Sequence, residues 1–265
     1  MIVSILIVAD FKEKFIFKTI KSCLNQSYKK IEILIGYSQL NKSIIKKILS
    51  YKKIKLFKIK KKFIYPTQDQ IYKIKYLFNR SKGKYIFLLD GDDIFLKDKI
   101  KQVYFFLKKE DDVLIYHKFF IKKNSKIYLL NEKKYKKNFF FKFLFNDWPQ
   151  NIATSVLSIT KKGFKNFFRE TNPLAWKYLA IDILLVIFFQ KKSKIKFLNK
   201  ILTIKNEGNE NLDTKFIGFF NKNYWFRRLE QHNYNYTFKK LKSIEHYICI
   251  MVVFFINYFI DNNKS

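Results

Sequence analysis

Apolar runs and amphipathic segments alternate along the first part of the chain. Continuous or alternating apolar positions, typical of strands, occur at 2–8, 31–35, 55–59, 85–89 and 113–116. Apolar positions at helical spacing lie between them, at 10–25, 43–51, 66–83 and 97–109. Strands that alternate with helices predict a mostly parallel sheet with right-handed crossovers.

Capping signals suggest where two of these helices begin and where one ends. Asp10 precedes Glu13 by three residues, and Thr67 precedes Gln70 at the spacing of a capping box. The helix predicted at 66–83 ends near Gly83, which is a suitable residue for its C-terminal cap.

The pattern changes after residue 117. We expect a hairpin of 119–121 with 126–130, then helices and short strands, and a polar loop at 206–211. The further helices are predicted at 138–145, 174–190, 216–231 and 236–260, and the further strands at 155–159, 195–197 and 201–204. This organisation predicts an α/β domain over 1–212, with halves at 1–116 and 117–212, followed by a C-terminal helical region at 213–265.

The composition excludes a disordered chain and changes the expected partners. Apolar residues make up 48% of the 265 residues, and the net charge is +33 from 54 Lys+Arg against 21 Asp+Glu. The cations are nearly all lysine, whereas nucleic-acid surfaces favour arginine, and the lysine excess accompanies the Ile, Asn, Phe and Tyr typical of an AT-rich genome. We therefore expect no nucleic-acid partner, and a positive field that attracts phosphorylated donors and anionic lipid headgroups.

Cysteines and the two ends of the chain bear on location. Cys23 and Cys249 are single and far apart, which favours a reducing, cytoplasmic setting. The apolar N-terminus lacks a basic leader and is expected to be a strand rather than a signal peptide. The apolar stretch 248–260 is short for a membrane span, so we expect peripheral contact with an anionic membrane at its inner face. Docking on a partner and packing in the core are the alternatives.

The strongest chemical signal is the acidic tetrapeptide Asp90-Gly91-Asp92-Asp93, directly after the apolar run at 85–89. Carboxylates gathered at the end of a buried strand repel one another, and a divalent cation with oxygen ligands would neutralise them. The carboxyl end of a strand in an open α/β sheet is also where ligands bind. The pattern favours a metal site for a phosphorylated substrate; the alternative is a turn whose aspartates cap the next helix.

Two segments resemble the family 2 glycosyltransferases. These are Ser22-Cys23-Leu24-Asn25-Gln26-Ser27-Tyr28 with the strand at 31–35, and the stretch 81–93 that ends in the Asp90–Asp93 motif, which is similar to the DxD motif of that family. The resemblance spans about residues 1–110 and continues more weakly to about 212. It implies a GT-A fold, a Rossmann-like mostly parallel sheet flanked by helices, with a nucleotide-diphosphate sugar donor, a Mg²⁺ or Mn²⁺ ion and inversion at the anomeric carbon.

The resemblance also implies roles for individual residues. Asp92 and Asp90 match the metal-binding acids, and Asp90 also matches the acid near the ribose; Asp10, Tyr37 and Lys73 are the further candidates for the nucleotide side. Asp182, the lone acid in an apolar helix, matches the general base, with an exposed position on an amphipathic helix as the alternative.

The chain departs from the family pattern at two places. The turn at 36–40 lacks the acid that reads the nucleotide base, so that Tyr37 would stack on the base instead, and Lys73 to Lys75 stand where the family has an Arg-Asn pair. On the acceptor side, the loop 146–150 contains Trp148 for sugar stacking and Asp147 as a second candidate base; a core tryptophan at a helix end is the alternative.

Together these features predict an inverting, metal-dependent glycosyltransferase. It would move a sugar from a nucleotide-diphosphate sugar to a hydroxyl of a cell-surface glycan or lipid-linked acceptor. The alternative is a non-catalytic, degenerate GT-A protein, or a basic module that binds membrane or nucleic acid.

Overall fold

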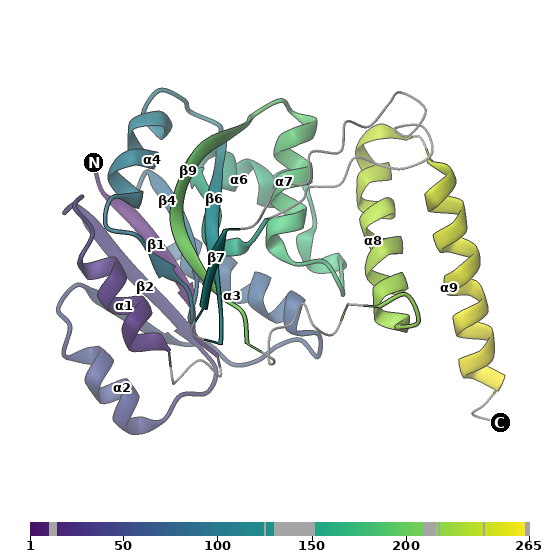
Figure 1. Ribbon diagram of the computed structural model, residues 1–265, viewed down its shortest axis with the longest axis horizontal. Coiled ribbons are helices and arrows are strands. Elements are labelled where there is room, and N and C mark those ends of the chain that lie inside the picture. Colours follow the sequence, from purple (N-terminus) through teal and green to yellow (C-terminus); the bar gives the residue numbers. More distant parts are fainter. Residues whose placement is uncertain are drawn as a thin grey trace.

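The computed structural model describes residues 1–10, 15–124, 126–129, 152–208, 216, 218–240 and 242–262 (Figure 1). Its strands are β1 Val3–Val8, β2 Ile31–Tyr37, β3 Ile54–Lys58, β4 Tyr85–Asp90, β5 Ile94–Phe95, β6 Leu114–Lys123, β7 Lys126–Leu129, β8 Ser158–Thr160 and β9 Ile195–Asn206. Its helices are α1 Ile16–Leu24, α2 Lys42–Leu49, α3 Pro66–Arg80, α4 Lys99–Leu107, α6 Lys161–Glu170, α7 Ile181–Lys191, α8 Lys222–Lys239 and α9 Ile244–Asn262. Two short 3₁₀ turns, η1 Thr154–Val156 and η2 Pro173–Ala175, complete the described elements.

One sheet organises the molecule, with the strand order β3-β2-β1-β4-β8-β6-β9-β5 and β7 paired to β6. The strands β3, β2, β1 and β4 are parallel neighbours, and β6 is parallel to β9. Between these two groups β8 runs antiparallel to both β4 and β6. The predicted α/β architecture with a mostly parallel sheet flanked by helices is confirmed.

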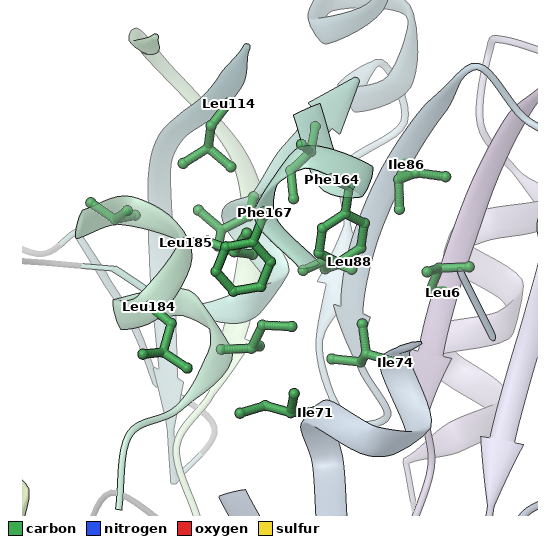
Figure 2. Close-up of a cluster of buried hydrophobic side chains, with 14 of the residues drawn as sticks. Leu6, Ile71, Ile74, Ile86, Leu88, Leu114, Phe164, Phe167, Leu184 and Leu185 are labelled. Atoms are coloured by element: carbon green, nitrogen blue, oxygen red, sulfur yellow. The ribbon is translucent and has the colours of Figure 1, made fainter. Parts of the chain in front are cut away.

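Helices cover both faces of the sheet because the central strands are apolar on both sides. In β1, Ile5 and Ile7 face α1 and α4, whereas Leu6 faces the opposite helical layer. That second layer, formed by α3, α6 and α7, is shown in Figure 2, where Leu6 lies near Ile74 of α3, and Phe164 of α6 lies beside Leu88 of β4. The two cores fix the strands between them, so that the carboxyl ends of β1, β2 and β4 form a rigid edge.

The C-terminal helices α8 and α9 lie beyond α7 at one end of the molecule (Figure 1). Tyr234 of α8 is buried in the second core and donates a hydrogen bond to the carbonyl of Leu184 in α7, at 3.2 Å. Arg228 of α8 pairs with Glu245 of α9. Among the described residues, none of the helices combines the length and the apolar character that crossing a bilayer requires.

The two predicted capping patterns are wrong, because their side chains make tertiary contacts instead. Helix α1 begins at Ile16, and the Asp10 carboxylate accepts a hydrogen bond from the Ser38 amide at 2.6 Å. Helix α3 has no side-chain cap; Thr67 donates to the carbonyl of Lys177, and Gln70 donates to Asp90.

Several element boundaries also differ from the expected ones. The strands expected at 195–197 and 201–204 form the single strand β9, with register shifts against β6 that absorb the irregular segment. The helix expected over 174–190 begins only at Ile181, since η2 and an extended segment precede it. Strand β5 and helix α6 were not predicted, and the expected helix at 138–145 lies outside the described residues.

Gly83 was expected to cap a helix, but in the structure the absence of a side chain lets it pack against β1. Helix α3 ends at Arg80, and the Gly83 amide donates to Ser4 Oγ at 2.8 Å. A Cβ at this position would lie 2.5 Å from the Ser4 backbone nitrogen and 2.9 Å from the Val3 carbonyl carbon. Only a residue without a side chain allows the backbone before β4 to pack this closely on β1.

We therefore predict that Gly83→Ala destabilises the protein by about 1–3 kcal/mol, the usual cost of an overpacked site. The free energy of unfolding, measured by urea denaturation, checks this. Gly208→Ala is the matched control, because a Cβ at Gly208 meets no atom within 4 Å, and its effect should stay within about 0.5 kcal/mol. Equal unfolding free energies for the two variants would contradict the prediction.

Candidate active site

The acidic motif forms a tight turn at the carboxyl end of β4. Asp90 is the last residue of the strand, the Gly91 amide donates to the Val8 carbonyl at 3.1 Å, and the Asp93 amide donates back to the Asp90 carbonyl at 3.2 Å. Asp92 and Asp93 are buried, with exposed fractions of 7% and 1%. The backbone thus holds three carboxylates within one turn at the end of a buried strand, where the sequence analysis expects them.

Polar groups from three distant segments fix the orientation of these carboxylates. Gln70 of α3 donates to Asp90 Oδ1 at 2.9 Å. Ser155 Oγ accepts the Asp90 amide at 2.9 Å and hydrogen-bonds the Asp93 carboxylate. The Asn206 amide donates to Asp93 Oδ1 at 2.8 Å, and its side chain donates to the Asp92 carbonyl. Asp93 therefore ties the turn to the end of β9.

Burial and mutual repulsion dominate the electrostatics of the turn. Burial, followed by the charges of Asp93, Asp92 and Asp182, raises the pKa of Asp90 well above its usual value, with Lys205 acting in the opposite direction. Burial and the charge of Asp92 raise the pKa of Asp93 to about 7, against the hydrogen bonds from Ser155 and Asn206. Negative charge is in excess at this edge of the sheet.

Asp182 lies in the first turn of α7, and its carboxylate acts on the same site. Asp182 Oδ1 accepts the Ile183 amide at 2.7 Å, as expected of an acid at a helix N-terminus. Its charge contributes to the raised pKa of Asp90, although 92 positions of sequence separate the two residues. The following residues Leu184, Leu185 and Phe188 are fully buried, so that the core anchors the helix that carries this acid.

The segment that leads into α7 is held from two sides. Glu230 of α8 accepts the amides of Lys177 and Tyr178, at 2.9 and 2.7 Å. From α3, Thr67 donates to the carbonyl of Lys177, and Gln68 donates to the carbonyl of Leu174 at 2.7 Å. The position of Asp182 therefore depends on both α3 and the C-terminal region.

A second group of charges lies at the ends of β1 and β2. The Lys73 ammonium, only 1% exposed, is paired with the carboxylates of both Asp10 and Asp69. Asp10 also accepts the Ser38 amide, directly after Tyr37, which is buried at the end of β2. The structure brings Asp10, Lys73 and Tyr37 together, but it directs the charge of Lys73 to two acids of the chain itself.

Lys99 is a buried cation that the sequence analysis did not single out. Its ammonium donates to the Ser155 carbonyl and to Thr203 Oγ1, the latter at 3.1 Å, and lies 3.6 Å from the centre of the Phe95 ring. Burial lowers its pKa well below the usual value, while the charge of Asp93 acts to raise it. A lysine in an amphipathic helix gives no signal in the sequence that would distinguish it from its exposed neighbours.

The donor set fits a divalent cation that is completed by a substrate. Within the described ranges, no group of three acidic, histidine or cysteine side chains converges into a complete metal site. Mg²⁺ and Mn²⁺ sites for phosphorylated substrates, however, use one or two carboxylates, with phosphate oxygens as further ligands. Asp93 Oδ2 is buried without a hydrogen-bond partner, and a cation would relieve the repulsion that raises the pKa of Asp90.

The other candidates from the sequence lie apart from this site or outside the described residues. His232 and His246 stack between α8 and α9, with ring centres 5.1 Å apart, and His117 is buried beside β9. Both cysteines are buried and free. Asp147 and Trp148 fall within the part of the chain that the structure does not describe.

Comparison with known proteins identifies the family. A model described as glycosyl transferase family 2 matches residues 4–166, more than half of the chain. The chain belongs to this family. A search among curated protein sequences gives no match.

Solved structures of glycosyltransferases share the fold of this family 2 member. S. aureus TarS 1–349 in complex with UDP-GlcNAc aligns with a TM-score of 0.63 at 10% identity, over 96% of this chain and 70% of that chain. The mannosyltransferase PcManGT from Pyrobaculum calidifontis, in complex with GDP-Man and Mn²⁺, aligns with a TM-score of 0.55 at 11% identity, over 92% and 68%. At these identities the likeness establishes the fold, which is GT-A as expected.

We predict that Lys73→Met destabilises the protein by about 3–5 kcal/mol, because it leaves the buried carboxylate of Asp69 and the partly exposed carboxylate of Asp10 without their shared cation. Urea denaturation again provides the measurement. Lys75→Met, two positions along the same helix at a partly exposed site, is the control and should cost less than about 1 kcal/mol. A Lys73 variant as stable as the control would show that the ion triad contributes nothing to the fold.

Proposed function

We propose that this protein is a metal-dependent, inverting glycosyltransferase that uses a nucleotide-diphosphate sugar. The observation that carries the proposal is the turn of three carboxylates at the carboxyl end of β4, which Gln70, Ser155 and Asn206 hold in place. The charge of Asp182 in α7, which contributes to the raised pKa of Asp90, supports it. The acidic turn after β4 and the carboxylate of Asp182 have different surroundings, which suits two tasks, one on the donor and one on the acceptor. A non-catalytic protein has no need of this arrangement.

On the donor side, Asp90 and Asp92 would hold Mg²⁺ or Mn²⁺ together with the diphosphate, and the cation would offset the charge that develops on the leaving group. Asp10 and Tyr37 border the same edge of the sheet, where the nucleoside would lie, with the Tyr37 ring stacked on the base. Lys73 would act indirectly, since its ammonium holds Asp10. The neighbours bound to UDP-GlcNAc and to GDP-Man support a nucleotide-sugar donor and leave the base open.

On the acceptor side, Asp182 would serve as the general base. The acceptor hydroxyl oxygen forms a bond to the anomeric carbon from the face opposite the diphosphate, and the bond from that carbon to the diphosphate oxygen breaks. The hydroxyl proton passes to the Asp182 carboxylate, and the configuration at the anomeric carbon inverts. Because Glu230 and Thr67 hold the segment before α7, the chain fixes this base before the acceptor arrives.

The acceptor that we propose is a cell-surface glycan or a lipid-linked glycan. The setting would be the cytoplasm, at the inner face of the cell membrane. The two buried free thiols suit a reducing compartment. The net charge of +33 suits phosphorylated donors and anionic surfaces.

Asp92→Ala should abolish metal-dependent donor binding while the fold survives. With Mn²⁺ present, a donor at about 100 times its Kd stabilises the native state by about 2.7 kcal/mol, which raises the melting temperature by several degrees. A panel of UDP- and GDP-sugars, ranked by this shift with and without EDTA, would identify the donor for the wild-type protein. The same shift should be absent for Asp92→Ala and for the wild type in EDTA.

Asp98→Ala is the control for this experiment, because Asp98 is an exposed acid that makes no capping hydrogen bond. It should keep the full donor shift. If Asp92→Ala bound UDP or GDP with Mn²⁺ as tightly as Asp98→Ala does, the assignment of the metal site would be wrong.

Asp182→Asn keeps the shape of the side chain and removes its basicity. We expect donor binding to persist and turnover to fall by about 10²–10⁴-fold, the range for a positioned base. Once the donor is known, single-turnover transfer to an acceptor measures the chemical step. Asp111→Asn, at a carboxylate that is 73% exposed, should transfer at the wild-type rate. A normal rate for Asp182→Asn would remove this residue from the mechanism.

A further inference from the structure

Helix α9 carries a continuous apolar stripe on its outer face. The stripe comprises residues at helical spacing that are each between 41% and 66% exposed: Ile244, Tyr247, Ile248, Met251, Phe254, Phe255, Tyr258 and Phe259. The opposite face of α9, with His246, Cys249 and Val253, is buried against α8. Figure 1 shows α9 as the outermost element, with α8 between it and α7.

No charged side chain interrupts this α9 stripe. The acid of the first turn, Glu245, faces α8, where Arg228 Nε donates to it at 2.7 Å. Further exposed aromatic residues precede α8: Phe219 and Phe220 are 66% and 100% exposed. Because α8 and α9 run antiparallel (Figure 1), the start of α8 lies at the same end of the hairpin as Tyr258 and Phe259.

Exposed lysines flank the stripe at both ends of the helical hairpin. Lys240 and Lys242 lie in the connection between α8 and α9, and Lys222 begins α8 beside Phe220. An apolar and aromatic face with lysines at its borders is the arrangement of helices that lie in the interface of a bilayer. Tyrosine and phenylalanine suit that depth, and lysines reach the headgroup phosphates.

The charge of the chain decides between the two occupants that could cover such a face. A second copy would bring another net charge of +33 against the first, which opposes association. An anionic bilayer has the opposite sign and covers a stripe of any length. We propose that α9 lies in the headgroup region of an anionic bilayer, with its stripe directed toward the acyl chains.

Membrane binding by α9 does not depend on the proposed function, but its consequence for Asp182 does. Helix α8 connects the stripe to the segment before α7 through Glu230. A bound α9 would therefore hold Asp182 at a fixed height above the bilayer, within reach of an acceptor whose lipid lies in the same membrane.

Sedimentation with sucrose-loaded vesicles tests the proposal. Wild-type protein should pellet with vesicles of phosphatidylcholine and phosphatidylglycerol, bind vesicles of phosphatidylcholine alone much more weakly, and dissociate as NaCl screens the charges. In the double variant Phe254→Ser/Phe255→Ser the affinity should fall by about tenfold or more, because even one buried phenylalanine accounts for a change of that size. Phe105→Ser, at a 50% exposed phenylalanine of α4, is the control and should bind as the wild type does.

Two further measurements distinguish a loss of membrane binding from a loss of folding or of dimerisation. Circular dichroism and thermal unfolding should be unchanged in the double variant, since both rings are exposed. Equal vesicle binding by the double variant and the wild type would overturn the role of α9. So would a wild-type dimer, detected by light scattering, that the double variant loses while neither protein binds vesicles. Because no sugar transfer is measured, failure here leaves the donor experiments independent.

Discussion

Like charges buried together at the end of β4 are the constraint on which the rest of the site depends. Burial and three neighbouring acids make ionisation of Asp90 unfavourable, and Lys205 offsets only part of this. A neutral side chain helps to fix the turn, because Ser155 hydrogen-bonds both Asp90 and Asp93. The nearby cation Lys99 donates to the Ser155 carbonyl rather than to a carboxylate. The turn is thus held in place while the neighbouring acids still raise the pKa of Asp90, and a cation bound from outside would relieve that repulsion.

The ends of β1 and α3 solve a similar problem in the opposite way. There the two acids Asp10 and Asp69 share the buried ammonium of Lys73, so that the charges are balanced within the chain. A buried pair of this kind contributes little net stability compared with apolar side chains, but removing one partner is costly. At the acidic turn, by contrast, the pKa of Asp90 stays well above its usual value, because Lys205 offsets only part of the effect of burial and of the neighbouring acids.

Local patterns in the sequence predicted most strands and the position of the acidic turn, because apolar runs and the residues that follow them are adjacent in the chain. They failed where a side chain has a distant partner. Asp10 looked like a helix cap, but its carboxylate binds the Ser38 amide and Lys73. Ser155 and Asn206, which orient the turn, are 65 and 113 positions away from the groups they bind, and no local pattern marks them. The resemblance to a family supplied Asp182, which periodicity alone would leave as one polar position in an apolar helix.

The C-terminal helices are separate in sequence pattern but continuous with the α/β domain in their packing. Tyr234 of α8 is buried in the same core as Leu184 of α7, and its hydroxyl donates to the backbone of that helix. Glu230 accepts two amides of the segment just before Asp182, although burial raises the pKa of this carboxyl above its usual value against the effect of those hydrogen bonds. Glu230 thus fixes the backbone at Lys177 and Tyr178, although its burial disfavours the charged carboxylate. Any force on α8 therefore acts first on the segment that leads into α7, and the helical region is structurally part of the support for Asp182.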